Sequence, residues 1–225
     1  MRKFYLYIIC TMIVSYFDVK YNLKSIFLFT FFVISVPFFN DVKNYFKISI
    51  LKINKIFAIY VIIFSLSFTI LFSLLPHLIF RDYSINKIED FTNYGILKVF
   101  LLSPILEELI FRGSLLSLLV KTESPKKAIF LSSLGFSLAH YLSDSSLFAV
   151  FVLGVFLAYV YLKTENIFLC IIVHALNNFL ALVFSPFLIS ILKIKETGCY
   201  LLEIIVMSSV IMSLSLFKIY KQSKN

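Results

Sequence analysis

The stretch GILKVFLLSPILEELIFRGSLLSLLV, from Gly95 to Val120, decides the fold class of this chain. It is long and apolar enough to cross a lipid bilayer, since a membrane-spanning helix needs about 20 predominantly apolar residues. Its middle nevertheless carries Glu107, Glu108 and Arg112. A charge at mid-membrane costs about 2.5–3.5 kcal/mol on insertion scales, so ionisable residues inside a span are functional candidates. The stretch therefore predicts a membrane helix that carries a polar site.

The composition extends this prediction to the whole chain. Of its 225 residues 60% are hydrophobic and 15% charged, and the charges fall mainly between long apolar runs. This predicts an all-α, polytopic membrane bundle of about eight transmembrane helices, forming a single membrane domain over residues 1–225. The expected spans are Phe4–Phe17, Ser25–Phe39, Ile56–Phe80, Gly95–Val120, Lys127–Leu142, Ser146–Leu162, Ile167–Leu192 and Cys199–Phe217.

The formal net charge of +9 does not indicate a nucleic-acid partner. The lysines flank apolar runs, where they set topology and contact anionic lipids of the bilayer. With eight spans both termini face one side, and most of the Lys and Arg residues lie on that side. The positive-inside rule then predicts a multi-pass protein of the cell membrane with both termini in the cytoplasm. The bias toward Phe, Ile, Lys, Asn and Tyr fits an AT-rich bacterial genome, and no pattern indicates an oligomeric state.

Two later spans also carry polar residues inside apolar runs. His140 follows Phe136 by four residues, and Asn178 follows His174 by four, so each pair shares one helical face. At about 1.5 Å of rise per residue, Glu107, His140 and Asn178 all lie about 18–20 Å from the cytoplasmic ends of their spans. We therefore expect polar groups from three helices to converge on one site within the membrane.

The three charges of the Gly95–Val120 span have different interpretations. Glu108 and Arg112 are four residues apart, which predicts an ion pair that lowers the cost of burying either charge. Glu107 points about 100° away from Glu108 on a helix, and no cation stands four residues from it. A buried carboxylate of this kind is the better candidate for a general base.

Hydrolysis is the chemistry that suits a carboxylate, two imidazoles and a carboxamide. A carboxylate and an imidazole can deprotonate a water molecule and direct it at a carbonyl carbon. A second imidazole and an amide can stabilise the resulting oxyanion, worth roughly 3–4 kcal/mol for one donor. Alternatively, two imidazoles and a carboxylate can bind zinc and activate a metal-bound water. The sequence leaves both open, and it contains neither the HExxH of zinc proteases nor the GxSG of a rhomboid-type serine site.

The polar residues resemble the motifs of a known family. EELIFRG, from Glu107 to Gly113, resembles the EExxxR motif of the CAAX protease and bacteriocin-processing (CPBP, or Abi) family, which includes the type II CAAX prenyl endopeptidases. The family motif FxxxH is matched by Phe136–His140, and HxxxN by His174–Asn178. The resemblance covers Ile96–Leu182 and so predicts a catalytic core over residues 96–182. N-terminal spans over 1–95 and a C-terminal span and tail over 183–225 flank it.

The resemblance implies an intramembrane endopeptidase that acts on a membrane-associated peptide or protein. It implies that Glu107 and His140 activate water and that His174 and Asn178 form the oxyanion site. The supporting residues that it implies are Glu108, Arg112 and Phe136. We favour a mechanism without a metal cofactor, because an asparagine suits an oxyanion donor better than a zinc ligand. In the zinc alternative the ligands are Glu107, His140 and His174.

Two other functions compete with the protease. A non-catalytic bacteriocin-immunity or membrane scaffold protein would keep the same fold and use the motifs for stability. A proton-coupled transporter would use the buried carboxylates, but the chain lacks the paired interrupted helices often found in transporters.

Overall fold

The computed structural model describes residues 55–79, 98–141, 146–184, 187 and 198–222. The secondary structure of these residues is entirely helical. Four stretches are long and apolar enough to cross a membrane: Lys55–Leu75, Leu147–Thr164, Ile167–Phe184 and Tyr200–Lys221. The chain is therefore a helical membrane protein, as predicted, while the count of about eight spans stays a prediction. The first two expected spans, Phe4–Phe17 and Ser25–Phe39, lie outside the described residues.

The described residues form two compact units. Unit 1 contains the described residues 103–141 and 146–171, and unit 2 contains 55–79, 98–102, 172–184, 187 and 198–222. The division falls inside the expected core of residues 96–182, so each half of that core is described with its own unit. The domain boundaries expected from the sequence stay predictions.

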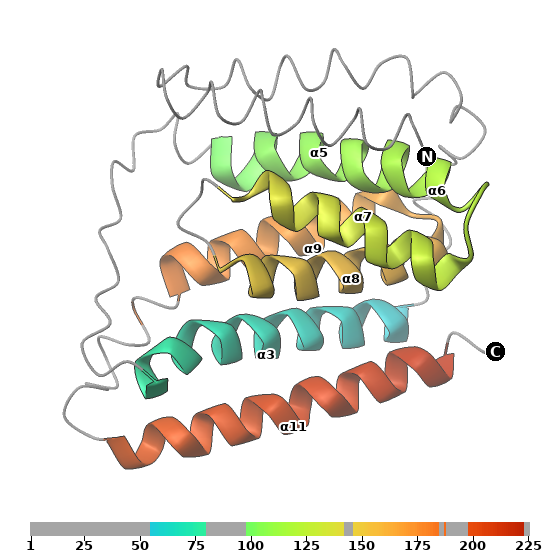
Figure 1. Ribbon diagram of the computed structural model, residues 1–225. Helices are drawn as coiled ribbons and strands as arrows, with labels where there is room; N and C mark the ends of the chain where they lie inside the picture. Colours follow the sequence, from blue (N-terminus) through green and yellow to red (C-terminus); the bar gives the residue numbers. More distant parts are fainter. Residues whose placement is uncertain (1–54, 80–97, 142–145, 185–186, 188–197, 223–225) are drawn as a thin grey trace, which may run out of the picture. The chain divides into compact units, whose positions relative to one another are not determined.

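Unit 1 is built on the helical stretch that carries the EELIFRG sequence. This stretch consists of α5 (Ser103–Glu108), the π-helix η2 (Leu109–Leu116) and α6 (Ser117–Leu119), which follow one another without a break (Figure 1). It is followed by α7 (Pro125–Ala139) and α8 (Leu147–Thr164). Helix α7 begins two residues before the expected Lys127, at a proline, because the first turn of a helix does not need the missing N–H.

Helices α7 and α8 approach closely at Gly154. A Cβ atom at this position would lie 3.1 Å from Ser133 Cβ and 3.2 Å from Phe136 Cδ1. Small residues at helix interfaces let two membrane helices pack with their backbones close together. Around this contact the buried core of unit 1 contains Phe111, Leu115, Phe136, Phe156, Leu157 and Val160.

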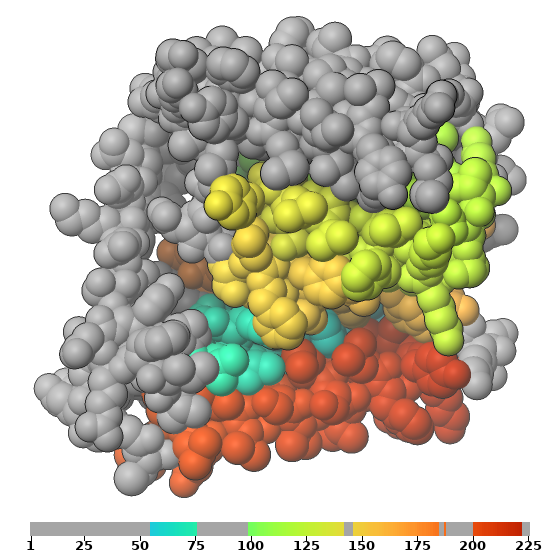
Figure 2. Space-filling view, in the orientation of Figure 1, coloured from blue at the N-terminus to red at the C-terminus, as the bar shows by residue number. Residues whose placement is uncertain are grey.

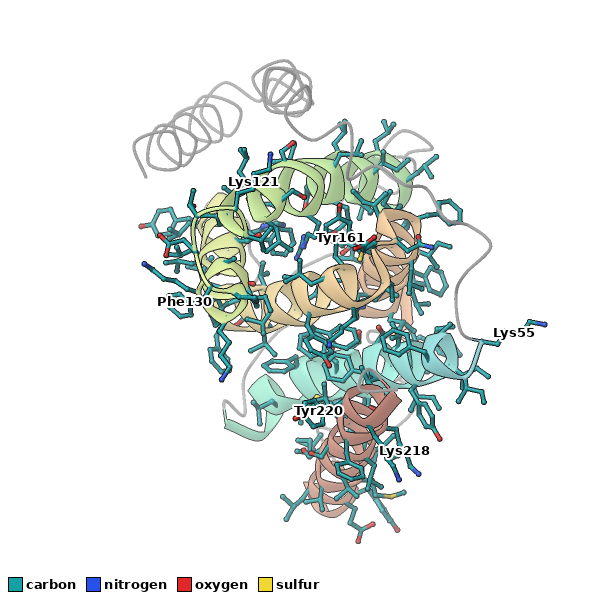
Figure 3. The ribbon with its side chains drawn as sticks, turned by 90° about the vertical axis from the view of Figure 1, so that its right-hand side faces the viewer. Lys55, Lys121, Phe130, Tyr161, Lys218 and Tyr220 are labelled. Carbon is teal, nitrogen blue, oxygen red and sulfur yellow. The ribbon has the colours of Figure 1, made fainter. Side chains whose placement is uncertain are left out.

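A tight turn joins α8 to α9 (Ile167–Phe179). Glu165 has φ 50°, in the left-handed region, and its N–H donates to the Tyr161 carbonyl at 2.7 Å. This conformation at the end of a helix favours glycine, so Glu165 occupies it under strain. Asn166 then caps α9, because its Oδ1 accepts a hydrogen bond from the Leu169 N–H at 3.0 Å. Tyr161 itself is buried, and its side chain points into unit 1 (Figure 3).

Unit 2 pairs α3 (Lys55–Ile79) with α11 (Gly198–Gln222), which run antiparallel and side by side (Figure 1; Figure 2). At one end of the pair the buried side chains of Leu74, Leu201 and Ile205 form a hydrophobic cluster. At the other end lie Lys55 and Lys218 (Figure 3). The π-helices η1 (Lys98–Leu102) and η3 (Leu180–Phe184) complete the unit, and η3 contacts α3.

Replacing Gly154 by valine tests the close approach of α7 and α8. The added carbons would meet Ser133 and Phe136, and overpacking of this kind typically costs about 1–3 kcal/mol. We expect Gly154→Val to lower the midpoint of thermal unfolding in detergent by several degrees. Ala149→Val, at a half-buried position of α8, is the control and should change the midpoint little. An unchanged midpoint in Gly154→Val would contradict the packing described here.

Candidate active site

In unit 1, Glu107 of α5 and His140 at the C-terminus of α7 face one another. His140 Nε2 lies 3.5 Å from Glu107 Oε2, and both side chains are partly exposed, at 21% and 15%. This distance is longer than a good hydrogen bond. It allows both atoms to contact the same water molecule. The structure therefore brings together, within one unit, the two residues that the family resemblance assigns to water activation.

The orientation of the His140 ring is set by its own helix. His140 Nδ1 lies 2.9 Å from the Phe136 carbonyl oxygen. A carbonyl can only accept a hydrogen bond, so Nδ1 carries a proton and Nε2 is the nitrogen that faces Glu107. A water molecule between Nε2 and the Glu107 carboxylate could donate a hydrogen bond to each of them.

Glu108 and Arg112 form the ion pair that their spacing predicts. Arg112 Nη1 donates to Glu108 Oε1 at 2.7 Å, and both residues are fully buried. Arg112 Nη2 also donates to the Gly154 carbonyl oxygen at 3.2 Å. The guanidinium lies 4.4 Å above the centre of the Phe136 ring, within the range of a cation–π contact. Hydrogen bonds and the ring thus compensate a charge that has no access to solvent.

Phe136 connects this ion pair to His140. Its ring touches Arg112 on one side, and its centroid is 4.8 Å from that of the His140 ring. Phe111 of η2 packs edge-on against it, with ring centroids 5.2 Å apart. The phenylalanine of FxxxH therefore packs between the buried charges and the imidazole, and it restricts where the imidazole can lie.

The remaining predicted site residues, His174 and Asn178, lie on the part of α9 that belongs to unit 2. His174 is buried, at 3% exposure, and Asn178 is half-buried. The Asn178 Nδ2 donates to the carbonyl oxygen of Val99, in η1, at 3.0 Å. The convergence of these two residues with Glu107 and His140 stays a prediction.

Asn177, next to the motif, links α9 to α3. Its Nδ2 donates to the Val173 carbonyl at 2.8 Å, which turns Oδ1 toward the Thr69 hydroxyl, 2.9 Å away. Hydrogen bonds of this kind between membrane helices contribute about 0.6 kcal/mol on average. The sequence indicates Asn177 as a residue that joins helices, but nothing in it selects Thr69 as the partner. The only local signal is that Ser65 and Thr69 share a face of an apolar helix.

The three ligands of the zinc alternative are divided between the two units. Glu107 and His140 meet in unit 1, while His174 belongs to unit 2. Within the residues that the structure describes, no group of three or more His, Cys, Asp or Glu side chains is arranged to hold a metal ion. A catalytic zinc usually has three protein ligands, so the zinc alternative needs His174 as well as the Glu107–His140 pair, and it stays a prediction.

Comparison with known protein families gives one match. Residues 89–180 match the family model described as type II CAAX prenyl endopeptidase Rce1-like. The matched segment contains the three motifs, Glu107–Arg112, Phe136–His140 and His174–Asn178. Comparison with curated proteins and with solved structures gave no significant match.

Two ion pairs, Glu108–Arg112 and Glu123–Lys127, have the same spacing and length but differ in burial, so comparing them tests how much burial adds to the stability that a pair confers. Arg112→Met leaves the fully buried Glu108 carboxylate without its charge partner, and breaking a buried pair in this way typically costs about 3–5 kcal/mol. Lys127 and Glu123 are also four residues apart and 2.7 Å from each other, but Lys127 is 54% exposed. Lys127→Met should therefore change stability by no more than about 1 kcal/mol. Denaturant titration in mixed micelles measures both.

The double variant Glu108→Gln/Arg112→Met supplies the internal control. It removes the uncompensated charge, so part of the lost stability should return. Equal losses for Arg112→Met and Lys127→Met would contradict the assignment of Glu108–Arg112 as a buried, structurally required pair.

Proposed function

We propose that this chain, which belongs through residues 89–180 to the Rce1-like family of type II CAAX prenyl endopeptidases, is an intramembrane protease that uses Glu107 and His140 to activate water. It hydrolyses a peptide bond in a membrane-associated peptide or protein. The observation that carries the proposal is the 3.5 Å approach of His140 Nε2 to Glu107 Oε2 between α5 and α7. The family match supports the class of reaction, and the contact supports the two residues.

The reaction begins with a water molecule that contacts both side chains. His140, with its Nδ1 proton held by the Phe136 carbonyl, orients the water through Nε2. The Glu107 carboxylate takes one proton as the water oxygen attacks the carbonyl carbon of the scissile bond. When the C–N bond of the tetrahedral intermediate breaks, the Glu107 carboxyl returns that proton to the leaving nitrogen. No proton is gained or lost by the enzyme over the cycle.

The oxyanion of the intermediate needs donors that are in place before the reaction. In the proposed mechanism His174 and Asn178 supply them. The Asn178 carboxamide has two N–H groups, and the contact with Val99 uses one of them. The second is free to bind an oxyanion, where one oriented donor in a dry site is worth about 2.7–4 kcal/mol.

The proposed orientation in the membrane follows the charges. The positive-inside rule puts both termini in the cytoplasm. The antiparallel pairing of α3 and α11 supports this, because it leaves Lys55 and Lys218 at the same end of the pair (Figure 3). In this orientation that basic end faces the cytoplasm and its anionic lipids.

Glu107→Gln keeps the shape of the side chain and removes the base. We expect cleavage of a fluorogenic peptide with a farnesylated cysteine and a C-terminal tripeptide to fall by about 10²–10⁴-fold, with the purified full-length protein in detergent. Glu203→Gln, on an exposed position of α11, should cleave at the wild-type rate. Undiminished cleavage by Glu107→Gln would contradict the proposal. If the intact protein cleaves neither this probe nor an unprenylated transmembrane peptide, the protease function itself is contradicted.

The choice between the metal-free mechanism and the zinc alternative has a separate test. We expect the cleavage rate to be unchanged after incubation with 1,10-phenanthroline and gel filtration into metal-free buffer. A rate that falls with the chelator and returns on adding zinc would instead assign Glu107, His140 and His174 as metal ligands.

A further inference from the structure

We infer that Pro104 is a positioning residue: it leaves the Val99 carbonyl without an N–H partner in its own helix, and this carbonyl then holds the Asn178 carboxamide. The inference rests on the proposed function, in which Asn178 donates to the oxyanion. The residues that carry it are Val99 in η1, Pro104 in the first turn of α5, and Asn178 on α9.

The hydrogen-bond pattern of η1 explains why the Val99 carbonyl is open. In a π-helix each carbonyl accepts from the N–H five residues later. For Val99 that residue is Pro104, which has no N–H. In an α-helix the partner would be Ser103, but the π-helix pattern assigns the Ser103 N–H to the carbonyl of Lys98. This pattern therefore assigns no backbone donor to the Val99 carbonyl.

Asn178 fills the open position. Its Nδ2 lies 3.0 Å from the Val99 oxygen. A carbonyl shielded from water is unfavourable without a donor, so this bond is favoured over an empty acceptor. Because the carbonyl can only accept, the amide nitrogen of Asn178 must face it, and this sets which way the carboxamide is turned. The second N–H of the same nitrogen is then directed away from Val99, at a fixed angle.

A second contact holds the same register. Phe100 and Phe179, the residues that follow Val99 and Asn178, pack edge-to-face with ring centroids 5.9 Å apart. On the other side of Asn178, Asn177 is held by its bonds to Thr69 and Val173. The Asn178 carboxamide is thus fixed by its own bond and by the contacts of both its neighbours.

Introducing an N–H at residue 104 should weaken the hydrogen bond between Asn178 and the Val99 carbonyl. In Pro104→Ala the new N–H competes for the Val99 carbonyl, so the Asn178 carboxamide turns more freely. A small misplacement of a catalytic group can cost about 10²-fold in rate. We expect kcat for the farnesylated fluorogenic peptide to fall about 10–100-fold, while KM changes less than twofold.

A double-mutant cycle separates positioning from a general structural effect. If Pro104 acts through Asn178, Pro104→Ala should cause no further loss of kcat in the Asn178→Ala background. The matched control is Pro125→Ala, in the first turn of α7, where the helix needs no N–H donor. Its kcat and KM should equal those of the wild type. Pro104→Ser restores the same N–H and repeats the test if the alanine variant does not fold.

Each result has one meaning. If the fold-losses of kcat in Pro104→Ala and Asn178→Ala multiply in the double variant, the inference is overturned, because Pro104 then acts independently of Asn178. A wild-type rate for Pro104→Ala, with Asn178→Ala impaired, would overturn it too and leave the proposed function intact. A wild-type rate for Asn178→Ala would instead overturn the oxyanion role in the proposed function.

Discussion

The cost of burying charge in an apolar helix bundle is the constraint on which unit 1 depends. Glu108 and Arg112 have no access to solvent, and each compensates the other. Arg112 also donates to the Gly154 carbonyl and lies over the face of the Phe136 ring. Each of these contacts requires another element to be in one position: α8 must present a carbonyl where it has no side chain, and α7 must present a ring. The ion pair therefore fixes η2, α7 and α8 relative to one another. It also helps to position His140, because the His140 ring packs against Phe136.

Two of the contacts that matter most involve a residue of a π-helix. The π-helix η2 carries Arg112 and begins directly after Glu108, and η1 presents the Val99 carbonyl to Asn178. A π-helix changes which N–H each carbonyl receives, and it is often found at functional sites. In a membrane, where water cannot satisfy a carbonyl released in this way, a side chain must do so. This explains why the hydrogen bond of the Asn178 carboxamide both satisfies the Val99 carbonyl and holds the carboxamide in one orientation.

What the sequence predicts depends on how far apart the interacting residues are. The helices over 55–79, 147–164 and 198–222 are long apolar runs, and hydropathy alone finds them. The Glu108–Arg112 pair follows from a spacing of four on one helix. By contrast, Thr69–Asn177 and Val99–Asn178 join residues far apart in the chain, and many other polar side chains would have been equally good partners. The π-helices cannot be predicted from the sequence for another reason. They depend on a shift of backbone hydrogen bonds, which the periodicity of apolar side chains does not record.

The turn at Glu165 has a consequence for how the protein enters the bilayer. Only Glu165 and Asn166 separate α8 from α9, and each of these helices belongs to a stretch able to span the membrane. Two consecutive spans with so short a connection must cross in opposite directions. Two spans joined in this way would insert as one helical hairpin during biosynthesis, in which neither could reverse its direction without the other. The direction in which α9 presents His174 and Asn178 would thereby be coupled to the side of the membrane on which Lys163, in the last turn of α8, lies.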